Sequence, residues 1–291
     1  MKGWLVNDRL TAIEGTRTFW HHLLDAIPGL VAKAPGTYRG LAEQVELEER
    51  EERPDYIIRN AAYFRALNVR CPVISFVQDI VYGATRRDLI EACEASRIVV
   101  FNSEYTRSRY PELDGCISHV IPIGTDGNVF KRKPVDVDVD SVLWVGSKHP
   151  VKGFDAAVRL AMESARPWVF VMKDDANVTL PNATVFHRIP QEHLASIAAL
   201  CAVGVCTSVE ETQHLAGIEM GLCGLPLVTT NVGIYHNRPA GAWGQVSAGN
   251  WHAEINAAAS LDKDAAAAYW RNEGLTLEAC MDSWRRLVAN V

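Results

Sequence analysis

Residues Val205 to Val228 read VCTSVEETQHLAGIEMGLCGLPLV, and the order of elements in this stretch indicates the fold class. It begins with the end of a short apolar run, which is typical of a buried strand. A polar loop carrying Glu211 follows, and the next apolar run, which carries Glu219, has the spacing of a helix. Gly224 to Pro226 end this helix and lead into another apolar strand. A strand, a helix and a second strand joined by short loops predict a parallel α/β sheet.

The same alternation occurs in two series along the chain, separated by a charged, proline-containing segment near residues 131–140 that is typical of a linker. The first series predicts strands at 3–6, 30–32, 56–58, 73–77, 98–102 and 119–122, with helices at 19–27, 41–53 and 86–95. The second predicts strands at 141–145, 168–172, 184–186, 203–206 and 227–229, with helices at 154–164, 191–200, 215–222 and 265–291. We therefore expect two domains, residues 1–130 and 131–291, and allow for a last helix that packs back on the first domain.

Each series predicts a doubly wound, Rossmann-like domain with a parallel sheet. Open sheets of this kind bind ligands at the carboxyl ends of their strands, so we expect a site in a cleft between two facing domains. The chain has 291 residues, of which 48% are hydrophobic and 22% charged, and this is sufficient for two cores of modest size.

Composition narrows the range of partners and compartments. The net charge of -6 gives the chain no general attraction to nucleic acids or anionic lipids. The glutamates between residues 43 and 52 predict a solvated helix face, unlike the basic amphipathic helix of membrane-docking enzymes. The seven cysteines form no CxxC pair and mostly lie in apolar runs, which indicates reduced thiols in a cytoplasmic protein. No apolar run is long enough for a signal peptide or a bilayer span, so we expect no membrane insertion.

The start of the helix after Glu211 is suited to a diphosphate, because free N–H groups and the positive end of the helix dipole attract anions. Carboxylates beside such a site would accept hydrogen bonds from sugar hydroxyls rather than face the phosphates. Glu211, Glu219 and the start of the helix are therefore interpreted as parts of one binding site.

In this context the stretch resembles the E-x7-E segment of retaining glycosyltransferase family 4, the glycogen synthase-like GT-B enzymes. Ser208, Glu211, Glu219, Gly224 and Pro226 match the family pattern. The resemblance implies that Glu211 contacts the donor sugar near its reacting carbon and that Glu219 binds the ribose hydroxyls. The family's Gly-Phe-Gly is replaced here by Thr212, Gln213 and His214, so we expect donor selectivity to reside at these three residues. Leu215 is expected to contact the donor as well.

A second segment, Leu143 to Gly153, is similar to Val-Gly-Arg-x4-Lys-Gly of the family's donor domain. Fixed cations there stabilise the negative charge that develops on a departing diphosphate. Lys152 matches the family's lysine, Ser147 takes the place of its arginine, and Lys148 is the candidate replacement for that charge. Gly146 is expected to line the same donor site. Ile189, in a segment like Val-Pro-x-x-x-Leu, is expected to contact the nucleotide base.

In the first half, Gly15, Thr16 and Arg17 stand where the family has a glycine-rich loop near the phosphates and the acceptor. Gln78 and Asp79 end the fourth strand, where the family often has His-Asp, and the resemblance implies acceptor-side contacts for them. Helix capping is the alternative role for Asp79. Gly124 would permit a backbone turn close to the cleft.

Taken together, the resemblance implies a retaining glycosyltransferase that moves a hexose from a UDP- or GDP-type nucleotide sugar to an acceptor hydroxyl. Glu211, Lys152 and Asp79 are the candidate catalytic residues. Domain closure would exclude water, and the departing phosphate would deprotonate the acceptor on the same face. Because Lys152 and helix N-termini would balance the phosphate charge, we expect no metal and no other cofactor.

Two alternatives from other classes stay open. One is a GT-B protein that binds sugar nucleotides without catalysis, which the departures at Ser147, Gln78 and Gln213 favour. The other is a GT-B sugar-nucleotide epimerase, which would release free nucleotide together with a new hexose. For a transferase, a glycan or small molecule is the preferred acceptor, and a modified base in DNA is the second choice because the acidic chain disfavours it.

Overall fold

The chain leaves its first structural unit after Gly124 and returns to it after Leu277. One unit comprises Met1–Gly124 and Glu278–Val291, and the other comprises Thr125–Leu277. The computed structural model describes residues 1–6, 15–33, 41–61, 65–134, 139–174 and 179–291, apart from the side chains of residues 15–18 and 41.

The first unit is built on a six-stranded parallel sheet with the strand order β2-β1-β3-β4-β5-β6. Its strands are β1 (Gly3–Val6), β2 (Leu30–Lys33), β3 (Tyr56–Asn60), β4 (Val73–Val77), β5 (Ile98–Phe101) and β6 (Ser118–Val120). β1, β3, β4 and β5 are buried along their whole length. This is the burial expected of parallel strands that helices cover on both faces.

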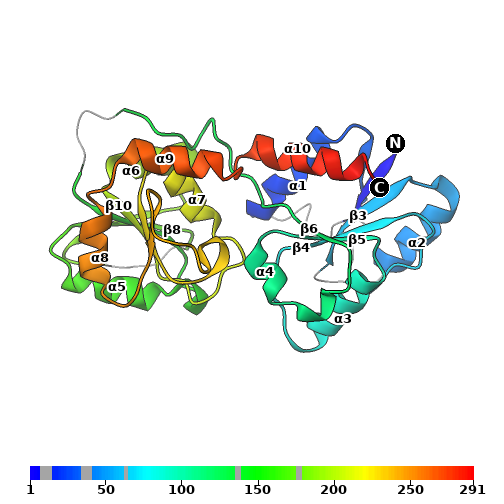
Figure 1. Cartoon of the computed structure of the whole chain (residues 1–291), viewed down its shortest axis with the longest axis horizontal. Helices are drawn as coiled ribbons and strands as arrows, with labels where there is room; N and C mark the ends of the chain where they lie inside the picture. The colour runs from blue at the N-terminus through cyan, green and yellow to red at the C-terminus, as the bar shows by residue number, and fades with distance from the viewer. Residues whose placement is uncertain (7–14, 34–40, 62–64, 135–138, 175–178) are drawn as a thin grey trace. The chain divides into compact units, whose positions relative to one another are not determined.

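Helices from both ends of the chain cover this sheet: α1 (Gly15–Ala26), α2 (Leu41–Glu52), α3 (Gly83–Glu94), α4 (Glu104–Ser108), the 3-10 turn η3 (Pro111–Leu113) and α10 (Leu277–Val288). α10 lies beside α1 (Figure 1). Trp284 of α10 packs edge-on against Phe76 of β4, with ring centroids 5.4 Å apart, and lies 6.3 Å from Phe19 of α1. Arg285 Nε also donates to the Ala26 carbonyl at 3.0 Å. The last helix is therefore part of the first unit's core.

The second unit contains another six-stranded parallel sheet, with the order β12-β11-β10-β7-β8-β9. Its strands are β7 (Val142–Gly146), β8 (Trp168–Met172), β9 (Ala183–His187), β10 (Val203–Cys206), β11 (Leu227–Thr229) and β12 (Gly244–Val246). Its helices are η4 (Pro150–Lys152), α5 (Phe154–Glu163), α6 (Gln191–Leu200), α7 (Leu215–Leu222), η5 (Gly233–Tyr235), α8 (Trp251–Ala258) and α9 (Lys263–Asn272).

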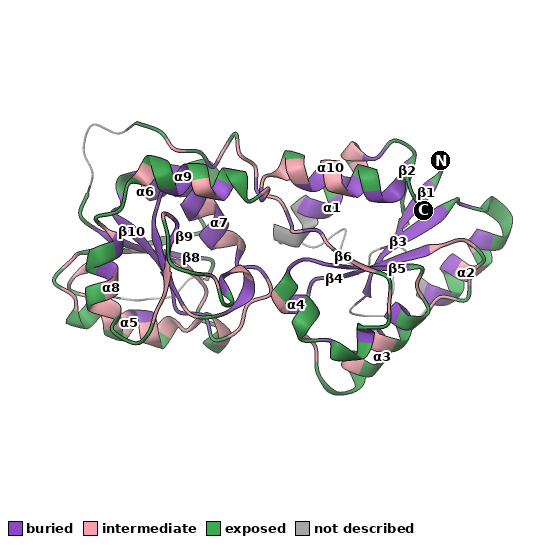
Figure 2. Ribbon diagram, in the orientation of Figure 1, coloured by how far each residue is buried: buried purple, intermediate pink, exposed green. Residues whose placement is uncertain are grey.

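Two apolar clusters enclose the second sheet. One joins the sheet to α6, α7 and α9 and includes Ile218, Trp243 and Trp270. The other joins it to α5 and α8 and includes Trp144 and Phe170. Figure 2 shows the resulting pattern, with buried strands at the centre of each unit and exposed residues on the outer faces of the helices. Each large apolar side chain buried in this way contributes about 1.5–3 kcal/mol.

Most predicted elements are present, with ends that differ by a few residues. α1 begins at Gly15, four residues before the predicted start at Phe19. The C-terminal helical segment is divided into α9 and α10, and Gly274 in the break has a left-handed φ of 69°. The prediction omitted β12 and α8. β12 has only three residues, and its Gly244 carries no side chain that could reveal a strand pattern.

The division between the units lies six residues before the boundary expected from the linker. Residues 125–130 belong to the second unit, and Phe130 is buried in its core. Thr125 N–H donates to the Leu275 carbonyl at 2.9 Å, and Leu277 N–H donates to the Thr125 carbonyl at 2.8 Å. The chain therefore enters and leaves the second unit at one place, through two paired segments.

Candidate functional site

In the second unit, the direction of the strand order reverses between β7 and β10. The chain runs from β7 outward through β8 to β9, and then returns to place β10 on the other side of β7. The loops after these two strands therefore diverge at the carboxyl edge of the sheet, where open α/β sheets bind ligands. Lys152 follows β7 and Glu211 follows β10, so both predicted groups lie at this point.

The loops after β7 and β10 pack closely because residue 153 is a glycine. Gly153 has a φ of 64°, and a Cβ there would lie 2.0 Å from the Thr207 carbonyl oxygen. Val209 N–H donates to the Val151 carbonyl at 2.8 Å. Thr207 Oγ1 also lies 3.1 Å from the carbonyl oxygen of Lys152 and 2.9 Å from that of Gly153. These contacts fix the backbone of Lys152 beside the loop that carries Glu211.

Two donors hold the Glu211 carboxylate. Lys152 Nζ lies 2.6 Å from Glu211 Oε1, and Ser208 Oγ donates to the same oxygen at 2.8 Å. The side chain of Glu211 is 10% exposed. Burial alone would raise the pKa of Glu211, but nearby His214 and Lys152, with the hydrogen bonds from Lys152 and Ser208, lower it. The arrangement therefore favours an ionised carboxylate, and Oε2 is not used by either donor.

Gly153→Ala is expected to destabilise the protein by about 2–4 kcal/mol, because alanine disfavours this φ and its Cβ would overlap the Thr207 carbonyl. Gly274→Ala is the matched control, since Gly274 has a φ of 69° but no atom within 4 Å of an added Cβ. The control should lose only the backbone cost of about 1–2 kcal/mol. Urea unfolding measures both, and equal losses would contradict the close approach of the two loops.

Glu219 is a half-buried glutamate in the middle of α7. Burial raises the pKa of its carboxyl to about 7, although His214 opposes the shift. Among the described residues, no hydrogen bond or ion pair supports this carboxylate. A carboxyl that is partly removed from water and has no partner is costly to ionise, and hydroxyl donors from a ligand would offset that cost.

The N-terminus of α7 lies beside Glu211 in sequence and lacks a side-chain cap. Its N-cap residue, His214, has φ 71° and ψ 69° and makes no capping hydrogen bond with its side chain. Gly217 and Ile218 N–H groups donate to the His214 carbonyl at 3.1 and 3.4 Å. The N–H groups of Leu215 and Ala216 therefore have no acceptor within the helix, which suits this end to an anion.

The segment predicted to set donor selectivity is mostly buried. Gln213 is 2% exposed and His214 is 6% exposed, whereas Thr212 is half-buried. A direct contact from this segment to a ligand would therefore come from its backbone or from the side chain of Thr212. Leu215 is also half-buried and packs against the core of the second unit.

The other predicted donor residues surround the end of β7 or precede α6. A Cβ on Gly146 would lie 2.6 Å from the Trp144 ring, so glycine allows this ring to pack beneath the strand end. Ser147 is half-buried. Lys148 is exposed, with Nζ 5.8 Å from the ring centroid of Phe154. Ile189 packs against the core of the second unit. Of the two predicted cations, Lys152 is the one that pairs with Glu211.

The first unit places Gln78 and Asp79 directly after β4, at the carboxyl edge of its sheet. Gln78 is buried, and within the described part of the chain its Oε1 has no hydrogen-bond donor. α3 begins after Tyr82, so Asp79 is not its N-cap residue and the capping alternative is wrong. The carbonyl of Asp79 accepts from the Tyr110 hydroxyl at 2.8 Å.

The remaining predicted positions of the first unit lie at the start of α1 and at the end of the unit. Gly15, Thr16 and Arg17 form the first turn of α1 instead of a loop, and their side chains lie outside the described residues. Gly124 is the last residue before the chain enters the second unit.

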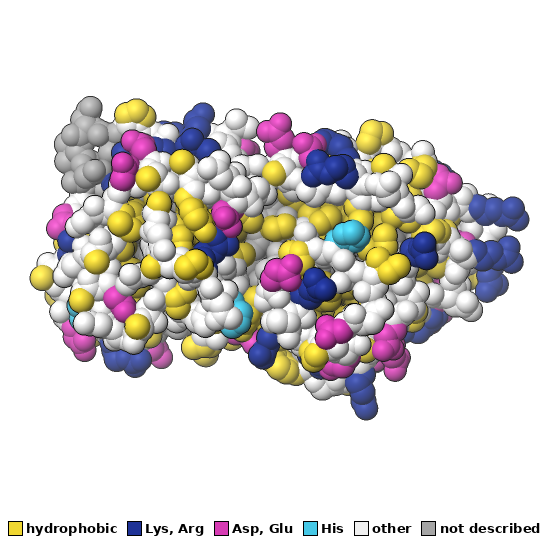
Figure 3. Space-filling view, viewed as in Figure 1, with side chains coloured by type: hydrophobic (Ala, Val, Ile, Leu, Met, Phe, Trp, Pro, Cys, Tyr) yellow, Lys and Arg dark blue, Asp and Glu magenta, His cyan; other side chains and the backbone are white. Residues whose placement is uncertain are grey.

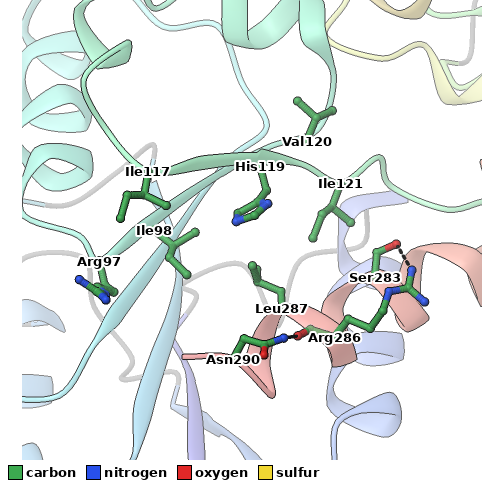
Figure 4. A pocket seen from close by; sticks show the side chains of 10 residues that line it. All are labelled: Arg97, Ile98, Ile117, His119, Val120, Ile121, Ser283, Arg286, Leu287 and Asn290. Atoms are coloured by element: carbon green, nitrogen blue, oxygen red, sulfur yellow. Dashed lines mark hydrogen bonds between the residues drawn. The ribbon is translucent and has the colours of Figure 1, made fainter.

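A groove of about 490 Å³ lies on the flank of the first unit, between β6 and α10 (Figure 4). Ile117, His119 and Ile121 face it from β6 and its flanking residues, and Leu287 faces it from α10. The groove follows the side of the edge strand, whereas ligands of open α/β sheets bind at the carboxyl ends of the strands. We therefore do not include it in the candidate site.

The surface carries charges of both signs. Acidic and basic side chains are interspersed over much of the face shown in Figure 3. No helix in the described ranges is both long and apolar enough to cross a bilayer. In the same ranges, no group of three or more His, Cys, Asp or Glu side chains is arranged to hold a metal ion.

Sequence reasoning missed a buried cluster next to Glu211. His214 Nδ1 lies 2.8 Å from the Tyr235 hydroxyl, and the imidazole also hydrogen-bonds the Cys206 thiol. Cys206 ends β10, whereas Tyr235 reaches the cluster through β11 and η5. No spacing rule relates these three positions, so the sequence carried no signal for them.

Known proteins resemble this chain in structure but not in sequence. No family model matches the chain, and no curated protein matches it. The solved structure of Anabaena HepE in complex with UDP-glucose matches with a TM-score of 0.79 and 14% identity, over 100% of each chain. Sucrose-phosphate synthase from Thermosynechococcus elongatus matches with a TM-score of 0.77 and 15% identity, also over 100% of each chain. The lipopolysaccharide outer core galactosyltransferase WaaB matches with a TM-score of 0.74 and 9% identity, over 100% of this chain and 99% of WaaB.

These matches bear on the fold. The matches to HepE and to sucrose-phosphate synthase cover the whole chain, so they include both six-stranded parallel sheets and their helices. The chain therefore has the GT-B fold with two Rossmann-like units that the sequence predicted.

Proposed function

We propose that this chain is a retaining glycosyltransferase that transfers a hexose from a UDP- or GDP-type nucleotide sugar to an acceptor hydroxyl. The observation that carries the proposal is the Lys152–Glu211 pair, 2.6 Å apart, at the carboxyl edge between β7 and β10. Solved structures with the same fold include HepE, which was captured with UDP-glucose. A UDP-sugar is therefore the first donor to test.

In this proposal, the diphosphate binds at the N-terminus of α7 and near Lys152. The N–H groups of Leu215 and Ala216 and the Lys152 ammonium stabilise the negative charge that grows on the leaving group as the glycosidic bond breaks. Because these groups are already in place, no metal ion is needed for that charge. Gly146, Ser147 and Lys148 lie around the end of β7, at the same edge of the sheet.

The two glutamates bind hydroxyl groups on either side of the diphosphate. Glu211 accepts a hydrogen bond from the donor sugar through Oε2, which Lys152 and Ser208 leave unused. Glu219 accepts the ribose hydroxyls, which supply the hydrogen bonds that its carboxylate otherwise lacks. The acceptor hydroxyl oxygen then attacks the sugar on the face from which the diphosphate departs. The departing phosphate oxygen takes the proton of that hydroxyl.

The acceptor is proposed to contact the first unit. Gln78 and Asp79 are the candidate residues because they follow β4 at the carboxyl edge of the first sheet. A glycan or a small molecule is the preferred acceptor. A modified DNA base is the second choice, because the net charge of -6 disfavours nucleic acid.

A thermal-shift screen tests the donor half of this proposal. UDP-, GDP- and ADP-sugars are each added at about 100 times their expected Kd, which would stabilise the folded state by about 2.7 kcal/mol. We expect a rise in Tm with a UDP- or GDP-sugar, with and without EDTA. No rise with any of them would contradict the proposal.

Product analysis separates the transferase from its alternatives. With the stabilising donor, the proposed enzyme releases nucleoside diphosphate and passes the sugar to acceptor or slowly to water. A non-catalytic binding protein would raise Tm but release nothing. An epimerase would release nucleotide together with a different hexose.

A further inference from the structure

We infer that His214 is a positioning residue of the donor site, whose buried side chain fixes the start of α7 and the loop that carries Glu211. This inference rests on the proposed function and assigns a role to a residue that would not itself touch the donor. It starts from the unusual cost of placing a histidine at this position.

His214 combines three features that each oppose folding. Its backbone is left-handed, with a φ of 71°, at a position that glycine would occupy without strain. The residue is 6% exposed, so its imidazole is largely removed from water. A protonated imidazole at this point would also lie at the positive end of α7, where a cation is unfavourable unless an anion binds. Strain that the surrounding structure maintains at one residue is typical of functional sites.

The surrounding residues are built to accommodate the imidazole. Nδ1 lies 2.8 Å from the Tyr235 hydroxyl, and the rings are 5.6 Å apart. Tyr235 is itself fixed, since its ring stacks on Trp243 at 5.7 Å. Gly217 provides the space, because a Cβ there would lie 1.6 Å from the Tyr235 hydroxyl and 2.5 Å from His214 Nδ1. The hydrogen bond with Cys206 ties the same ring to the end of β10.

These contacts connect His214 to both parts of the donor site. Its carbonyl accepts from Gly217 and Ile218 in the first turn of α7, so the position of His214 sets the position of that turn. Glu211 lies three residues before His214 in the chain. It packs against the segment that carries Tyr235, because a Cβ added to Gly233 would lie 3.2 Å from Glu211 Cβ. A shift of His214 would therefore displace the helix N-terminus and the Glu211 loop together.

The charge of His214 also supports a role in the donor site. The groups around it are Cys206 from β10, Glu211 from the loop, Glu219 from α7, Tyr235 from η5 and Lys152 from η4. Burial opposes protonation, but Cys206 and Glu211 raise the pKa of His214 above its ordinary value. As pH rises through that raised pKa, the cation is lost and negative charge next to the diphosphate site is no longer balanced. The transfer rate should then fall on the alkaline side.

His214→Asn tests the inference, because asparagine tolerates a left-handed backbone and is polar but does not titrate. We expect kcat to fall at least tenfold, the Kd for UDP measured by calorimetry to rise because the start of α7 shifts, and the alkaline decline of kcat to disappear. Tyr235→Phe keeps the stacked ring but removes the hydroxyl beside His214, so it should also lower kcat. Tyr269→Phe is the matched control, since Tyr269 lies in the same unit and accepts from Arg238, and it should keep wild-type kcat.

The outcomes distinguish this inference from the proposed function. A wild-type protein that neither transfers nor hydrolyses any nucleotide sugar would overturn the proposed function. An active wild type with unchanged kcat and pH profile in His214→Asn would overturn the role of His214 alone. An NMR titration of the histidine side chains supplies a readout without turnover, and a His214 pKa below that of an exposed histidine would also overturn it.

Discussion

Lys152→Ala is expected to lower kcat for sugar transfer by about 100- to 1,000-fold, the usual loss when one preorganised charge-stabilising group is removed. The ammonium lies 2.6 Å from Glu211 and is fixed by the turn at Gly153. Its removal leaves the Glu211 carboxylate with fewer partners and takes a cation away from the leaving group. Initial rates with the donor identified by thermal shift measure the effect.

Two further variants define what Lys152 does. Lys133→Ala removes an exposed lysine of the same unit and should change kcat less than twofold. Lys152→Arg keeps the charge in a different shape and should restore part of the rate. A Lys152→Ala enzyme that retains a third of the wild-type rate would exclude Lys152 from the transfer step. If Lys148→Ala instead produced the large loss, the cation over Phe154 would be the one that the leaving group needs.

Glu219→Gln is expected to make the protein more stable at pH 8.5 and to weaken nucleotide binding at least tenfold. The folded-state pKa of Glu219 is about 7, against 4.5 for the ordinary carboxyl. A raised carboxyl pKa means that the folded state resists ionisation, so stability is complete below pH 4.5 and is lost as pH rises through 7. The loss at pH 8.5 is about 3 kcal/mol, and glutamine, which never ionises, avoids it.

Urea unfolding at pH 5 and pH 8.5 tests the stability half of this prediction. The gain from Glu219→Gln should be below about 1 kcal/mol at pH 5 and largest at pH 8.5. Glu192→Gln, on the exposed first turn of α6, should change stability by less than about 0.5 kcal/mol at both pH values. Calorimetry with UDP tests the other half. A variant that is less stable at pH 8.5 and binds UDP normally would show that Glu219 is structural.

The sequence predicted the sheets well because their strands are short, apolar and separated by amphipathic helices. The resemblance assigned Lys152 and Glu211 to one donor site, and in the structure their two loops meet because parallel strands bring the loops that follow them to one edge. The sequence could not predict that Gln213 and His214 point inward, because helix-start loops show no hydrophobic period. Gln213 and His214 are buried because Tyr235 and Gly233 of η5 pack against this segment.

The boundary between the units shows a different limit of sequence reasoning. Proline and charge near residues 131–140 resemble a linker, but Phe130 is buried in the second core and Thr125 pairs with Thr276. Backbone pairing between distant segments leaves no mark in a local pattern. For the same reason, the sequence indicated the return of α10 to the first unit only as one possibility.

The return of α10 has a consequence for synthesis on the ribosome. The second unit is one continuous stretch, so it can complete its core while the chain is still growing. The first unit is translated first, yet Phe19 and Phe76 meet Trp284 only when the last helix has emerged. Of the two units, the one that is translated first is therefore completed last, because its Phe19 and Phe76 lack Trp284 until α10 has been made.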